Sequence, residues 1–112
     1  MTIYDLSNFS KTPYGRYPDD GSHNGTKFRE ILVEKLKEAR KTNEKLIIDF
    51  DNINIGIGSS FLEESFGGLI RKGYFTKEEL IGPNALLDIK STQGFYKSEI
   101  FSYISDAIQE EK

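Results

Sequence analysis

The fold is decided by residues 46–73, LIIDFDNINIGIGSSFLEESFGGLIRKG. Three consecutive apolar residues begin this stretch, a pattern typical of a strand that is buried on both faces, as in a parallel sheet. An amphipathic helix is expected over 60–72, because apolar residues recur there every three or four positions, and Gly73 is typical of a helix stop. A buried strand followed by a helix predicts an α/β fold, with helices packed on a sheet.

The remainder of the chain continues the alternation of strands and helices. Asn24 or Thr26 is expected to cap a long helix that ends at Asn43, and the sequence Thr76-Lys77-Glu78-Glu79 is a capping box that opens a shorter helix. The predicted order is β-β-α-β-α-(α)-β-α, in which the first two strands form a hairpin. The class is therefore α/β with a mixed four-stranded sheet flanked by helices. The strands are expected near 2–6, 14–17, 45–51 and 85–89, and the last helix begins near 94.

Composition limits the classes of function. The 112 residues are enough for one domain spanning 1–112. With 15 basic and 18 acidic residues the net charge is −3, so binding to nucleic acid through phosphate neutralisation is not expected. The sequence contains no apolar run of roughly 20 residues that could span a membrane, and Met1–Asp5 does not resemble a signal peptide. A cytoplasmic protein is therefore expected.

The sequence does not contain a recognisable catalytic or metal-binding motif. There is no cysteine, and His23 is the only histidine, in a loop rich in turn residues. Without a nucleophile near His23 or the ligand spacing of a zinc or calcium site, we expect no catalytic residue, no metal and no cofactor. The interpretation is a protein that is not an enzyme.

The informative segment is the turn between the predicted buried strand and the helix that follows it. Main-chain amides at a helix N-terminus favour an anion, and Gly56 and Gly58 supply half of a dinucleotide-binding fingerprint. Phe61 stands where the third glycine of that fingerprint belongs. Ser60 and Glu63 have the spacing of a capping box, which leaves the hydroxyl of the preceding serine free for another use.

Two segments resemble the signatures of a bacterial and phage family of STAS-like domains of unknown function. They are GRYPDDGSHNGTKFRE at 15–30 and GSSFLEESFGGLIRKG at 58–73. The family is related in fold to the STAS domains of anti-sigma factor antagonists, which implies a mixed sheet flanked by helices. In those antagonists the turn reads Asp-Ser-Ser/Thr-Gly, and a histidine-kinase-like ATPase phosphorylates the first Ser or Thr. Ser59 matches that phosphoacceptor, whereas Gly58 and Phe61 replace the Asp and the Gly.

The leading hypothesis is a regulatory module that binds another protein through this turn, and the partner that the resemblance implies is such an ATPase. Phe61 is expected to be exposed and to form an apolar contact, with an acidic rim at Glu64. The alternative is a domain that binds a nucleotide or another phosphate ligand at the same helix N-terminus, with polar groups from the loop that holds Arg16, Asp20 and Asn24. That alternative is disfavoured by anion repulsion from the glutamates after Phe61. A third reading is an assembly protein that forms a homodimer.

Overall fold

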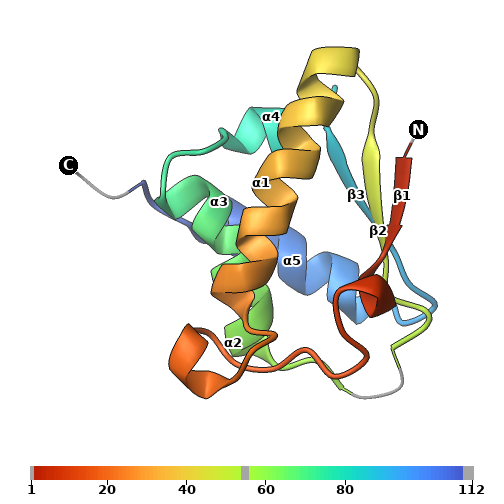
Figure 1. The fold of residues 1–112 in the computed structure, drawn as a ribbon. Coiled ribbons are helices and arrows are strands. Elements are labelled where there is room, and N and C mark those ends of the chain that lie inside the picture. Colours follow the sequence, from red (N-terminus) through yellow and green to blue (C-terminus); the bar gives the residue numbers. More distant parts are fainter. Residues whose placement is uncertain (1, 54–55, 110–112) are drawn as a thin grey trace.

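The computed structural model describes residues 2–53 and 56–109. Figure 1 shows the strands at one side of the molecule and the helices gathered on the other. The strands are β1 (Thr2–Asp5), β2 (Leu46–Asp49) and β3 (Leu87–Lys90), and they form a parallel sheet in the order β1-β2-β3. The α/β class is therefore confirmed.

The predicted strand at 14–17 is not formed, so the predicted hairpin and four-stranded mixed sheet are wrong for the described residues, where the sheet has three strands, all parallel. The main chain of that segment is used differently. The Tyr14 amide donates to the His23 carbonyl at 3.1 Å, and the carbonyls of Gly15 and Arg16 accept from Gly25 and Thr26 at 2.9 and 3.0 Å. The segment is thereby bound to the start of the first long helix and cannot join the sheet.

That helix is α1 (Gly25–Thr42), and its two ends were predicted correctly. The side chain of Asn24 accepts a hydrogen bond from the Lys27 amide at 2.9 Å, which is the N-cap interaction. At the other end Asn43 adopts a left-handed conformation with φ 58°, a geometry that asparagine tolerates better than most residues.

The second long helix runs without a break from Ser59 to Arg71 in three parts. These are α2 (Ser59–Leu62), one π-helical turn η3 (Glu63–Gly67) and α3 (Gly68–Arg71). The chain leaves this helix at Gly73, whose φ of 78° favours glycine. Two further helices are α4 (Lys77–Ile81), which begins with the predicted capping box, and α5 (Phe95–Asp106); short 3-10 turns are η1 (Leu6–Asn8) and η2 (Pro18–Asp20).

The core lies between the helices and one face of the sheet. Along β2, Leu46 and Ile48 are buried, whereas Ile47 between them is only half-buried, and on the same face as Ile47 the side chain of Ile3 is 58% exposed. The expectation that β2 is buried on both faces is therefore wrong, because the helices cover the face of Leu46 and Ile48. Within the described ranges no helix combines the length and the apolar character that crossing a membrane requires.

Candidate functional site

The turn before α2 begins the helix one residue earlier than the sequence predicts. Gly58 is the N-cap, in an extended conformation, and Ser59 is already the first helical residue. Ser60 is therefore not the cap, and the predicted capping box of Ser60 with Glu63 is wrong. Glu63 does not reach back to the helix start because its carboxylate is bound by arginines.

Both serines of the turn are exposed. The side chain of Ser59 hydrogen-bonds with the hydroxyl of Tyr103 on α5. Burial and the charge of Glu99 raise the pKa of Tyr103, and the hydrogen bond with Ser59 opposes this only in part. The phenol therefore keeps its proton at neutral pH, and Ser59 presents a hydroxyl at the surface next to a neutral hydrogen-bonding group.

Ser59 and Ser60 form one wall of an open groove of about 470 Å³. The other wall is the loop before α1, where Arg16 and Asp20 lie as the sequence hypothesis placed them. The carboxylate of Asp20 accepts hydrogen bonds from the amides of Arg16 and Tyr17 at 3.0 and 3.1 Å, and these bonds lower the pKa of Asp20. The groove is lined by Tyr14, Gly15, Arg16, Tyr17, Asp20, Gly58, Ser59, Ser60 and Phe61.

Two of the other predicted loop and turn residues have different places. Asn24 is buried, and its side chain is used as the α1 cap and as a donor to the Gly21 carbonyl at 2.8 Å, so it is wrong as a ligand-binding residue. Gly56 is exposed in the turn and does not line the groove.

Behind the groove lies a group of five charged side chains, which we call the arginine–glutamate cluster: Arg16, Arg29, Arg71, Glu63 and Glu64. Arg16 bonds to both carboxylates, with 3.0 Å between its Nη1 and Oε1 of Glu64. Arg71 also bonds to both, with 3.1 Å between its Nη2 and the same Glu64 oxygen. Arg29, reaching from α1, bonds to the carboxylate of Glu64 and donates to its main-chain oxygen at 3.1 Å.

The cluster pairs both glutamates of the turn with arginines. Three guanidinium groups bind the two carboxylates, and each carboxylate is bound by at least two of them. Burial raises the pKa of Glu63, but hydrogen bonds from Arg16 and Arg71 outweigh it, and the net pKa lies below its ordinary value. The arginines therefore offset the negative charge from which repulsion of an anion was predicted.

The predicted partner-binding pair, Phe61 and Glu64, is buried. The ring of Phe61 is fully inaccessible and stacks 5.7 Å from the ring of Phe28 on α1. Glu64 is 3% exposed within the cluster. Phe61 and Glu64 are three residues apart and share the side of the helix that packs against α1, so the predicted exposed contact is wrong.

Close packing of the two long helices explains why residue 68 is a glycine. A Cβ on Gly68 would lie 2.7 Å from Nη1 of Arg29 and 2.9 Å from its Cδ. A side chain at that position would require Arg29 to move. Gly68 therefore leaves the space in which Arg29 lies.

Sequence reasoning missed two of the five members of the cluster and the ion pairs that join them. Arg29 and Arg71 were not singled out, although Glu64 and Arg71 are seven residues apart, two helical turns, and so share one side of the helix. Arg16 and Glu63 are 47 residues apart, and the local pattern carries no sign that they meet.

The family model described as a STAS-like domain of unknown function matches residues 24–85, more than half of the chain. This chain belongs to that family. The matched segment includes the α1 cap, the Ser59 turn and four members of the arginine–glutamate cluster, whereas Arg16 lies before it. Searches of the curated proteins and of the solved structures find no significant match. The family carries no assigned function, so the chemistry of this STAS-like domain has to be argued from its own residues.

Proposed function

We propose that this STAS-like domain is a non-enzymatic regulatory module that binds another protein at the Ser59 turn and is switched by phosphorylation of Ser59. The observation that carries the proposal is the exposed Ser59 side chain at the first position of the helix, across the groove from Arg16. A kinase can reach this hydroxyl without unfolding the domain. The class of kinase that fits the family resemblance is a histidine-kinase-like ATPase.

A phosphate on Ser59 meets favourable charge. It adds about −1.5 to −2 charges and three acceptor oxygens. Arg16 lines the same groove as Ser59, and Glu63 and Glu64 bind its guanidinium group. Arginine presents several N–H donors to phosphate oxygens. Phosphorylation should therefore draw Arg16 toward Ser59 and change the surface of the groove.

The groove also has side chains suited to binding a protein. Tyr14 and Tyr17 are 71% and 55% exposed and flank the turn from the opposite wall. Tyrosine and arginine are the residue types that most often dominate binding energy at protein interfaces. These tyrosines take the role that the sequence hypothesis gave to Phe61.

The first experiment asks whether Ser59 is phosphorylated. The protein is purified from its native host under phosphatase inhibition, and the mass of the intact chain and of its peptides is measured. We expect a form that carries one phosphate on Ser59, absent from Ser59→Ala and retained in the matched control Ser60→Ala. Phosphate on Ser60 instead, or no phosphate under any growth condition, contradicts the switch.

The second experiment tests the partner surface. A partner captured by the wild-type domain should be lost with Ser59→Asp and with Tyr17→Ala, and it should be retained with Ser60→Ala. The partner is quantified by isotope-labelled mass spectrometry after crosslinking in cells. Equal recovery with all variants contradicts binding at this groove.

Arg16 in the groove lining favours one alternative, a phosphate-bearing small ligand such as a nucleotide in the same groove. Calorimetric titration with nucleoside mono-, di- and triphosphates tests it directly. Binding that is lost in Arg16→Gln supports the ligand. The absence of heat and of any thermal shift removes it and leaves the protein-binding function.

A further inference from the structure

The two edges of the sheet differ in how their main-chain groups are covered. β1 is an edge strand, because it pairs with β2 only. The amide of Thr2 donates to the Lys45 carbonyl at 3.0 Å, so the amide and carbonyl of the next residue, Ile3, point away from the sheet. In the described part of the chain, no strand lies along that side of β1.

The opposite edge, along β3, is partly blocked by its own side chains. The amide of Ile89 donates to Oδ1 of Asp88 at 2.8 Å. Lys97 from α5 binds the same carboxylate with 2.9 Å between Nζ and Oδ1. Charged side chains at an edge are a common way to prevent pairing with another strand. The β1 edge has no such block among the described residues.

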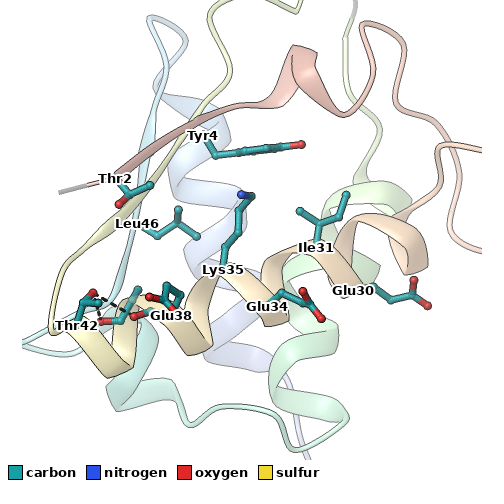
Figure 2. Close-up of a pocket in the computed structure, with 10 residues that line it drawn as sticks. Thr2, Tyr4, Glu30, Ile31, Glu34, Lys35, Glu38, Thr42 and Leu46 are labelled. Atoms are coloured by element: carbon teal, nitrogen blue, oxygen red, sulfur yellow. Dashed lines mark hydrogen bonds between the residues drawn. The ribbon is translucent and has the colours of Figure 1, made fainter.

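A groove of about 800 Å³ runs beside the open edge, between β1 and α1. Figure 2 shows that the side chains of Tyr4, Leu46 and Ile31 point into it and that Lys35 rises from α1 toward Tyr4. Nζ of Lys35 lies 4.7 Å from the centre of the Tyr4 ring. The floor is therefore apolar, and a strand laid against β1 would place alternate side chains over it, where Lys or Arg can cover the floor with their aliphatic stems and hold their charges at the rim.

The α1 side of the groove is acidic. Glu30, Glu34 and Glu38 all line it, are exposed, and recur every four residues along the helix. Against these three carboxylates the lining contributes one cation, Lys35. The groove is therefore net negative, whereas the carboxylates behind the groove at Ser59 are bound by arginines.

We propose that the β1–α1 groove receives an extended, basic segment of a partner protein, which pairs with the open edge of β1 as a fourth strand. Main-chain hydrogen bonds to Ile3 supply the pairing, and Lys or Arg side chains at alternate positions of the segment meet the glutamates of α1. The spacings agree, since alternate residues of a strand are about 6.6 Å apart and every fourth residue of a helix about 6 Å.

Charge separates this occupant from a second copy of the chain. Pairing of β1 with β1 of another copy would bring a second row of Glu30, Glu34 and Glu38 to the junction. Like charges at such a junction are unfavourable. A basic segment of a different protein forms ion pairs at the same positions instead.

The test uses a short fluorescent peptide of alternating valine and lysine as the probe, with the full-length chain. We expect saturable binding by fluorescence anisotropy that weakens with added salt. The matching valine–glutamate peptide should not bind. A valine–lysine peptide N-methylated at alternate residues, on the edge that would pair, should also fail, because it lacks the main-chain donors while the protein is unchanged.

The acidic row is tested by the double variant Glu34→Lys, Glu38→Lys, which should weaken binding by about tenfold or more. The matched control Glu78→Lys, Glu99→Lys makes the same change of net charge elsewhere and should leave binding within about twofold. Circular dichroism of both variants verifies folding.

The binding site is located by NMR measurement of amide hydrogen exchange. Bound peptide should slow the exchange of the Ile3 amide. Equal binding of the acidic peptide, equal binding to the Glu34 and Glu38 variant, or protection at Ser59 instead of Ile3 overturns the proposal. Concentration-dependent dimerisation through β1 overturns it in favour of a second copy. None of these outcomes bears on phosphorylation of Ser59.

Discussion

Two acidic regions of this domain carry the same kind of charge and are used in opposite ways. Glu63 and Glu64 are bound by Arg16, Arg29 and Arg71 behind the Ser59 turn. The three glutamates along α1, at 30, 34 and 38, are exposed at the rim of a groove. In the first region the carboxylates fix arginines in place, and in the second they define a surface. Whether an acidic segment presents negative charge at the surface therefore depends on which cationic side chains the fold places beside it.

The largest effect is expected from Glu64→Gln. This change removes the carboxylate that compensates the buried Arg29, and breaking a buried ion pair from one side costs about 3–5 kcal/mol of unfolding free energy. Urea unfolding measures it. The control Glu34→Gln, on the exposed acidic row, should stay within about 0.5 kcal/mol. If the two variants lose similar stability, the distinction between the regions is wrong.

A smaller loss is expected from Gly68→Ala, which tests the same region by geometry instead of charge. The added methyl group would overlap the buried, ion-paired Arg29 and force it to move, at a cost of about 1–3 kcal/mol, of which the higher helix propensity of alanine offsets up to about 1 kcal/mol. The matched control is Gly56→Ala, because a Cβ on Gly56 meets nothing within 4 Å. Thermal unfolding of both proteins is the measurement, and an unaltered Tm for Gly68→Ala would show that Arg29 is not held as described.

The next prediction concerns how much the N-cap residues of α1 and α2 stabilise the fold. Asn24→Ala should lose about 0.5–2 kcal/mol, because its side chain caps α1. Ser60→Ala should lose less than about 0.5 kcal/mol, because the cap of α2 is Gly58. Equilibrium unfolding of both variants measures the difference, and the reverse order would restore the capping box that the sequence suggested.

The smallest effect is a change in the pH dependence of stability. The folded pKa of Glu63 is lowered, so its contribution is present above its unfolded value of about 4.5 and is lost as pH falls through the folded pKa. Wild type should therefore lose stability more steeply below about pH 4.5 than Glu63→Gln. Unfolding free energies measured at several pH values compare the two slopes, and identical slopes contradict the pairing of Glu63.

These comparisons also show which parts of the fold local sequence determines. The caps at Asn24 and Thr76, the stop at Gly73 and the strand at Leu46 follow from residue type and periodicity, and all were predicted. The strand near Tyr14 was wrong, although its aromatics favour β-structure, because its main chain is bound to the start of α1. The β-propensity of aromatic residues is a local property of residues 14–17. The hydrogen bonds that hold this segment depend on residues about ten positions further along the chain.

The candidate site depended more strongly on distant contacts. Ser59 and Arg16 were both singled out, and they line one groove. Phe61 was expected at the surface because it lies at the start of the helix, but α1 covers that position and Phe61 stacks on Phe28. The arginines that bind Glu63 and Glu64 come from three separate parts of the chain, so sequence reasoning did not predict that both carboxylates are ion-paired.

The central claim is that the Ser59 turn receives a phosphate beside Arg16. The most direct measurement is the second pKa of phosphoserine placed at position 59, followed by ³¹P NMR titration. The ordinary value is about 6. We predict a value below that of a phosphoserine peptide, and a return toward the peptide value in Arg16→Gln. A value equal to or above that of the peptide, with no response to Arg16→Gln, would contradict the account.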